Sequence, residues 1–126
     1  MKESLFQFTN PKILSFELVS NPNFDEESFE GFSIANNVEI SEIEAGKKAL
    51  VILSLQINNE SDEYPFYIST KICAMFKHEG SKKFDSLLKI NAPALLLSYI
   101  RPIISMMTVQ SGFEALNIPF INFTDQ

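Results

Sequence analysis

The segment from Ala92 to Val109 constrains the fold most strongly, because its residues are apolar on nearly every side of a helix. Asn91-Ala92-Pro93 predicts the start of this helix, with a capping side chain followed by a proline in the first turn. Pro102 predicts a kink inside the helix, and Ser111-Gly112 predicts its end. Because one sheet covers only one side of a helix, the pattern predicts that a second subunit covers another side.

Most of the chain before this helix alternates between apolar and polar residues with the period of a β-strand. The first alternating stretch, Phe6–Leu18, is interrupted at Asn10-Pro11, which predicts a bulge or an edge position. The acidic stretch Asn21–Glu30 is predicted to cross over the sheet. Three further strands are predicted, around Phe32–Ser41, Leu50–Ile57 and Phe66–Phe76. The prediction is one α+β domain over residues 1–126, a four-stranded antiparallel sheet with one long crossover, backed by a long helix.

Charge and composition argue against several classes of function. The 16 acidic side chains outnumber the 10 basic ones, which gives a net charge of −6 and disfavours nucleic acid as a partner. The N-terminus enters a strand pattern without an apolar signal core, so we expect a cytoplasmic protein. The apolar run of the long helix is interrupted by Arg101 and Pro102, so no membrane insertion is expected.

No pattern of catalytic or cofactor-binding residues is present in the sequence. A single cysteine, Cys73, excludes an intramolecular disulfide and is predicted to be a small apolar strand residue. The single histidine, His78, is predicted to be exposed at a strand end. The four glycines are isolated, which excludes glycine-rich phosphate loops. We therefore expect no cofactor, no metal and no enzymatic activity.

The strongest motif lies in the last third of the chain. Residues 91–101 contain the pattern Pro-x-x-Leu-x-x-Tyr-x-Arg, and Gly112-Phe113, Leu116-Asn117 and Ile121-Asn122-Phe123 follow the helix. This set resembles the SecB family of export chaperones. The stretch Lys12–Glu17 is similar to the Ser-Phe-Glu of that family's first strand, so the resemblance covers nearly the whole chain.

The resemblance implies an ATP-independent holdase that binds apolar segments of unfolded proteins or preproteins. It also implies subunits that pair into dimers, and dimers that pair into tetramers. In such a protein Phe29 would line the client groove from the crossover loop. The other client-binding candidates are Phe24, Phe32, Leu96 and Ile100.

The family docks its translocase motor, SecA, through carboxylates on the outer face of the sheet. Glu17 supplies one such carboxylate and is the candidate docking residue. The neighbouring outer-face positions carry Ile13 and Ser69, which weakens the case for docking to SecA. The family's final helix and acidic tail also have no counterpart before Gln126. These departures point to the short SecB-like proteins and not to the export chaperone itself.

An alternative hypothesis keeps the fold but changes the function. The chain would then be a structural or dedicated interaction protein that binds one partner, without general holdase activity. Suppression of aggregation discriminates between the two hypotheses.

Overall fold

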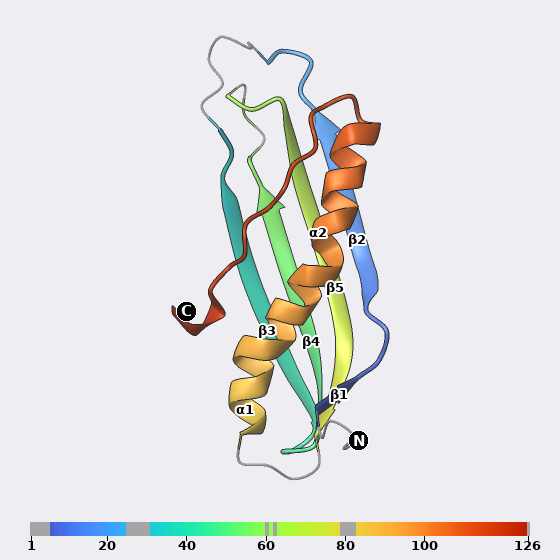
Figure 1. Ribbon diagram of the computed structural model, residues 1–126, viewed down its shortest axis with the longest axis vertical. Helices are drawn as coiled ribbons and strands as arrows, with labels where there is room; N and C mark the ends of the chain where they lie inside the picture. The colour runs from blue at the N-terminus through green and yellow to red at the C-terminus, as the bar shows by residue number, and fades with distance from the viewer. Residues whose placement is uncertain (1–5, 25–30, 60, 62, 79–82, 126) are drawn as a thin grey trace.

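The computed structural model describes residues 6–24, 31–59, 61, 63–78 and 83–125 (Figure 1). The strands are β1 (Phe6–Phe8), β2 (Lys12–Ser20), β3 (Ile34–Glu44), β4 (Lys48–Ile57) and β5 (Phe66–His78). The helical segments are α1 (Phe84–Ser86), the π-helical η2 (Leu87–Asn91), α2 (Ala92–Gln110) and the short 3-10 turn η3 (Phe123–Asp125).

All strand pairs are antiparallel, with β3, β4 and β5 side by side and both β1 and β2 on the far edge of β5. The described residues thus form five strands where the alternation predicts four. The predicted first strand is split at Thr9–Pro11, and a register shift between Ile13 and Ser15 adds a bulge. The α+β class and the antiparallel sheet backed by one long helix are as predicted. Residues 25–30 of the predicted crossover lie outside the described part.

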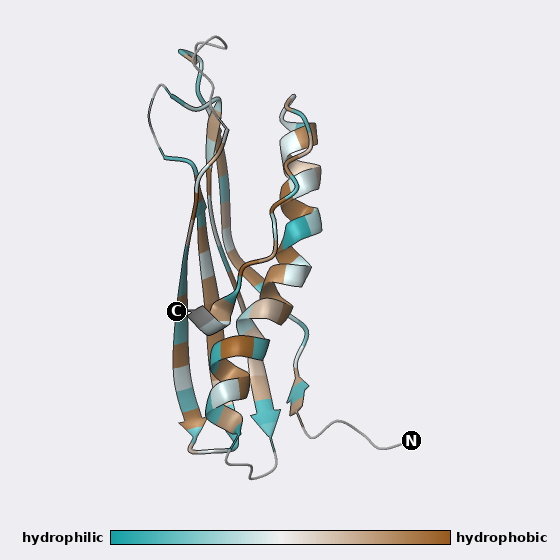
Figure 2. Cartoon of the chain, turned by 60° about the vertical axis from the view of Figure 1, so that its left-hand side comes forward, coloured by the Kyte–Doolittle hydropathy of each residue, from teal (hydrophilic) through white to brown (hydrophobic). Residues whose placement is uncertain are grey.

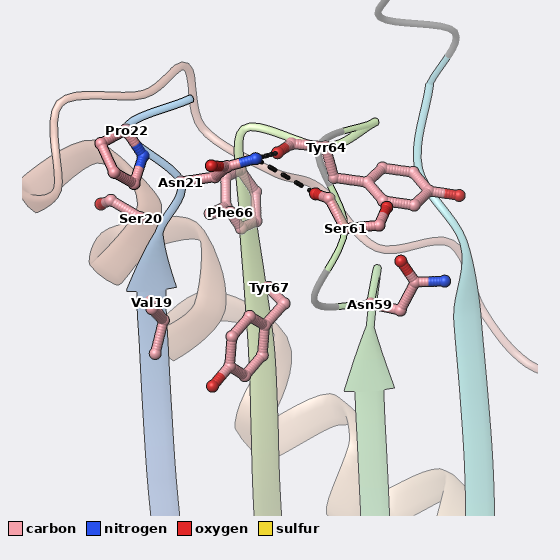
Figure 3. Close-up of a pocket in the computed structure, with 9 residues that line it drawn as sticks. All are labelled: Val19, Ser20, Asn21, Pro22, Asn59, Ser61, Tyr64, Phe66 and Tyr67. Carbon is pink, nitrogen blue, oxygen red and sulfur yellow. Dashed lines mark hydrogen bonds between the residues drawn. The ribbon is translucent and has the colours of Figure 1, made fainter. Parts of the chain in front are cut away.

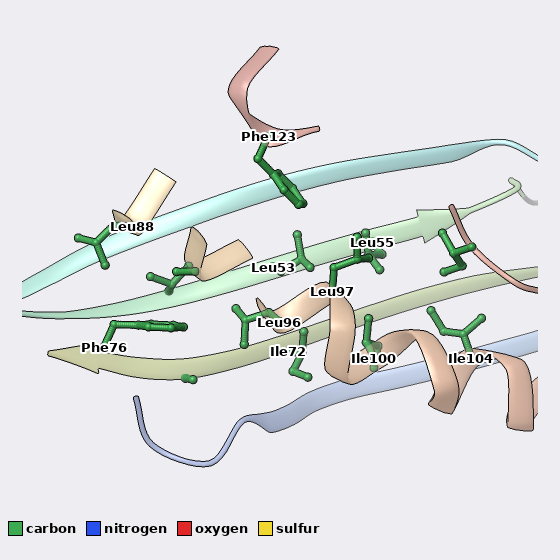
Figure 4. Packing of buried hydrophobic residues seen from close by; sticks show 14 of the residues in the cluster. Leu53, Leu55, Ile72, Phe76, Leu88, Leu96, Leu97, Ile100, Ile104 and Phe123 are labelled. Carbon is green, nitrogen blue, oxygen red and sulfur yellow. The ribbon is translucent and has the colours of Figure 1, made fainter. Parts of the chain in front are cut away.

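The molecule has two layers, with α1, η2, α2 and the C-terminal tail on one face of the sheet (Figures 1 and 2). Alternate side chains of β4 and β5 point to that face, as the period of two requires. These side chains pack against buried residues of the helix (Figure 4). The fully buried residues of this core include Leu53, Ile57, Ile68, Phe76, Leu96, Ile100 and Ile104.

The helical layer begins at Phe84, eight residues before the predicted start of the long helix, in a segment where Phe84, Leu87 and Leu88 hint only at a short helical turn. Asn91 has helical dihedral angles and its side chain makes no capping hydrogen bond, so the predicted cap is wrong. The N–H of Ala92 instead donates to the carbonyl of Leu87, five residues back, which marks a π-turn. We attribute this turn to Pro93, since a wider turn moves the preceding carbonyls away from the proline ring.

Helix α2 contains Pro102 and ends where predicted. The N–H of Phe113 donates to Thr108 O, and the N–H of Gly112 donates to Val109 O. With φ at +90° for Gly112, this is a Schellman-type helix end. The helical segment 84–110 is long enough and apolar enough to cross a membrane. The buried core helices of soluble proteins meet the same two criteria.

His78 is buried, not exposed as the sequence predicts. It ends β5, and its ring clusters with those of Phe6 and Phe84, with centroid distances of 6.4 and 6.0 Å. The prediction was wrong because α1 starts early and brings Phe84 over the end of the strand. Cys73 is buried on β5, in agreement with the prediction for a small apolar residue.

Candidate functional site

An apolar cavity of about 320 Å³ lies where the end of α2 meets the starts of β3 and β5. Its walls come from the residues that flank the crossover, from the β4–β5 turn and from the first residues of the tail. Phe66 and Phe113 form one wall, with ring centroids 4.8 Å apart. The described lining residues are Phe24, Phe32, Asn58, Pro65, Phe66, Phe113, Glu114, Ala115 and Leu116. Because Glu114 is the one ionisable residue in this set, the cavity suits an apolar group.

Asn58 fixes the rim of this cavity. Its Oδ1 accepts a hydrogen bond from the Ser33 N–H at 3.1 Å, and its Nδ2 donates to Phe66 O at 2.9 Å. The backbone N–H of Asn58 donates to Ser33 O at 2.8 Å. Asn58 has a positive φ of 60°, a conformation that asparagine tolerates better than most residues. One buried side chain therefore ties the segment that carries Phe32 to the strand that carries Phe66.

The tail wall of the cavity is held by side chains of α2 that bind its backbone. The N–H of Leu116 donates to Thr108 Oγ1 at 3.0 Å, and Ser105 Oγ donates to Leu116 O at 2.8 Å. One turn earlier in the helix, Arg101 Nε donates to Ile118 O at 2.7 Å. The Arg101 guanidinium also stacks over the ring of Phe120, 4.2 Å from its centroid. The helix thus holds an extended apolar segment through its peptide groups.

The sequence-predicted client residues separate into three groups. Phe24 and Phe32 line the cavity together, and Phe32 is 44% exposed. Leu96 and Ile100 are 0% exposed and pack between α2 and the sheet, so the structure places both in the core and not in a groove wall. Phe29 lies outside the described residues.

Sequence reasoning missed Phe66, Phe113 and Leu116 as cavity residues. Phe66 reads as an ordinary inward-facing strand residue, because alternation does not show that a strand end borders a cavity. Gly112-Phe113 was part of the motif in the tail. Its position just after a helix stop was the signal that could have placed Phe113 at the end of the helical layer.

Glu17 lies at the surface on the face of the sheet away from α2. It stands opposite Ser69 in the strand register, and Tyr67 donates its hydroxyl to Glu17 Oε1 at 2.8 Å. Tyr67 also lines a second cavity of about 210 Å³, which lies where β2 ends and β5 begins (Figure 3). Asn21 closes that cavity by donating from Nδ2 to the carbonyls of Ser61 and Tyr64.

The solvent side of α2 carries large apolar side chains. Tyr99, Met106 and Val109 are 43%, 54% and 52% exposed. Phe8 of β1 is 42% exposed and meets the Tyr99 ring edge-on at 6.4 Å. These residues continue from the helix onto the edge of the sheet.

In the part of the chain that the structure describes, no three His, Cys, Asp or Glu residues gather in a way that would hold a metal ion.

Comparisons with known proteins place the chain in a family. The family model of SecB, the preprotein translocase subunit, matches residues 6–125. The protein-export protein SecB of Anaplasma phagocytophilum is 33% identical over 100 residues, which cover 73% of this chain and 63% of that protein. The protein of the same name from Cupriavidus necator is 25% identical over 115 residues, which cover 89% of this chain and 67% of the relative. The chain thus spans about two-thirds of the length of these curated relatives.

Two solved structures share the fold. A SecB-like chaperone of Mycobacterium tuberculosis, in complex with a ChAD peptide from an antitoxin, has a TM-score of 0.69 at 10% identity, over 93% of this chain and 88% of that one. A protein of unknown function from Streptococcus agalactiae has a TM-score of 0.50 at 19% identity, over 91% and 97%. At these identities the structural likeness shows the fold alone. The family model covers nearly the whole sequence, and the chain belongs to the SecB family.

Proposed function

We propose that this protein is an ATP-independent, non-enzymatic holdase that binds apolar segments of unfolded polypeptides or preproteins. The observation that carries the proposal is the aromatic cavity beside the end of α2, on the fold of a chaperone family. Phe24 and Phe32 are the client-binding residues within it. The binding step uses apolar contact, so it requires neither nucleotide nor metal.

The cavity would accept one or two apolar side chains of an extended client. Its volume of about 320 Å³ lies at the lower end of the range for ligand pockets. Burying one large apolar side chain there contributes about 1.5–3 kcal/mol, which is enough for reversible capture but not for tight binding by a single contact. We therefore propose that several sites, on one chain or on several subunits, act together on each client.

The experiment is an aggregation assay without nucleotide, in which a chemically denatured test protein is diluted into buffer with an excess of this chain. We expect suppressed light scattering, and we expect Phe32→Ser to reduce the suppression while leaving the unfolding midpoint nearly unchanged. Phe120→Ser is the matched control, because Phe120 is 78% exposed but lies outside the cavity. Equal losses for the two variants would show that general surface apolarity, and not the cavity, holds the client.

The proposal has three further parts. The protein self-associates as a dimer or tetramer through the apolar side of α2. It acts in the cytoplasm and is not inserted in a membrane. Glu17 is an outer-face contact for a partner, although the surrounding positions do not favour SecA as that partner.

A second candidate function is a dedicated interaction module that binds a single partner. The small volume of the cavity favours it, because one fixed pair of side chains would fill the space. In the aggregation assay such a module would leave scattering unchanged while remaining folded.

A further inference from the structure

The face of the sheet away from α2 is bare. Figures 1 and 2 show that the helix and the tail both lie on the other face, and no described element crosses this one. Leu50 and Ile52 of β4 point to the bare face, since their neighbours Val51 and Leu53 are buried under the helix. Leu50 stands opposite Met75 in the register, so apolar side chains of β4 and β5 meet on this face, near the start of β4. All three are half-buried by their neighbours, and their outer surface faces solvent.

Lysines lie beside this apolar group on β2, on β5 and at the first residue of β4. Lys71 and Lys77 lie on β5 on the same face as Met75, and Lys12 of β2 stands opposite Cys73, between them. Lys48 of β4 stands directly opposite Lys77. These are four of the ten basic residues of a chain whose net charge is −6. The described carboxylates on the same face are Glu17, opposite Ser69, Glu39, opposite Ile52, and Glu44, opposite Lys48, so the four lysines leave the face net positive, opposite in sign to the chain as a whole.

The lysines lack partners within the described structure. The ion pair there joins Lys47 to Glu44 at 4.0 Å, and no described carboxylate lies as close to Lys12, Lys71 or Lys77. Like charges directly opposite each other in a sheet are destabilising, as with Lys48 and Lys77. A carboxylate bound beside these two lysines would offset that repulsion, so binding of an acidic group is expected to stabilise the surface.

We propose that this surface, defined by Leu50, Ile52 and Met75 with Lys12, Lys71 and Lys77, docks an acidic polypeptide segment of another protein. Apolar side chains of the segment would cover the apolar group, and its carboxylates would face the lysines. The apolar group favours a polypeptide over a phosphate polymer, which offers no apolar side chains. A second copy is a poorer match, because docking through the same face would set its lysines against those of the first copy.

The site is independent of the client cavity. The cavity is lined by the start of β5 and by the tail residues that follow α2, whereas the lysines lie on the face of β2, β4 and β5 away from the helix. A docked acidic partner and a client could therefore be bound at the same time. A basic partner would be repelled at this surface, which agrees with the weak case for SecA docking through Glu17.

The test uses protein with labelled methyl groups and a short synthetic peptide of alternating glutamate and leucine. We expect the peptide to shift the NMR signals of Leu50, Ile52 and Met75, and to leave Met106 on the solvent side of α2 unchanged. A peptide with lysine in place of glutamate should shift none of them. The double variant Lys71→Glu/Lys77→Glu should weaken binding about tenfold, because two attractions become two repulsions.

Lys89→Glu is the matched control, because Lys89 is an exposed lysine on the helical layer. Equal weakening by this variant would overturn the proposal, as would peptide shifts that map to the helix side. A charge-matched single-stranded oligonucleotide that shifts the same methyl groups as strongly would assign the surface to phosphate polymers instead. A change in the mass of the free protein on Lys71→Glu/Lys77→Glu would assign it to a second copy.

Discussion

Replacing Asn58 tests whether one side chain holds the rim of the client cavity. The side chain makes two hydrogen bonds, to the Ser33 N–H and to Phe66 O, from a residue that is 3% exposed. Three substitutions separate its contributions. Alanine removes both bonds and keeps a Cβ at a positive φ, which alanine tolerates less well than asparagine. Glycine removes both bonds without backbone strain, and aspartate keeps the acceptor but loses the donor to Phe66.

The expected magnitudes follow from these contacts. Each hydrogen bond contributes about 1 kcal/mol to the free energy of unfolding. Alanine in the left-handed region costs a further ~1 kcal/mol. We therefore expect losses of about 3 kcal/mol for Asn58→Ala and about 2 kcal/mol for Asn58→Gly. Asn58→Asp should also lose stability, because its carboxylate would face the carbonyl of Phe66 at neutral pH.

Urea unfolding followed by far-UV circular dichroism measures these losses, at one fixed protein concentration since self-association adds to apparent stability. The glycine variant should also suppress aggregation less than the parent, because Phe32 and Phe66 are no longer tied together. If Asn58→Gly were as stable as the parent, the two hydrogen bonds would contribute nothing and this account of the cavity rim would be refuted. If Asn58→Ala and Asn58→Gly lost the same free energy of unfolding, the ~1 kcal/mol assigned to alanine in the left-handed region would be wrong.

Two further predictions concern α2. Leu96→Ala should lower the free energy of unfolding by about 2–5 kcal/mol, because Leu96 is 0% exposed in the core. A variant that lost client binding without this destabilisation would show that Leu96 lines a groove and is not a core residue. Met106→Lys should lower the mass measured by light scattering, because Met106 is 54% exposed on the apolar side of α2, whereas Gln110→Lys at an exposed polar position should not. A parent protein that is already a monomer at micromolar concentration would contradict the second prediction.

The strands were predictable because apolar and polar residues alternate along a strand that has one buried face and one exposed face. Even the interruption near Asn10-Pro11 was visible, since proline donates no hydrogen bond to a ladder. The start of the helix was not predictable from Asn91-Ala92-Pro93, because packing outweighed the local signal. Phe84 and Leu88 are 2% and 1% exposed, and burying them extends the helical layer through a π-turn.

The cavity was only partly predictable. Phe24 and Phe32 were named from the family resemblance, which located them beside the crossover. Leu96 and Ile100 were named for the same groove, and the structure places them in the core. The physical reason is that a helix apolar on all sides gives no periodic signal to distinguish its core face from an exposed face.

The apolar sides of α2 have different surroundings, which are the sheet, the chain's own tail and, on a third side, solvent. The core face packs on the sheet through residues such as Ile104. A second side is covered by the chain's own tail, where Ile118 is 0% exposed and its carbonyl binds Arg101. The tail thus supplies part of the cover that the sequence pattern assigned to another subunit. What remains exposed is a stripe through Tyr99 and Met106. In the proposed dimer or tetramer, the second subunit would have to cover only that stripe.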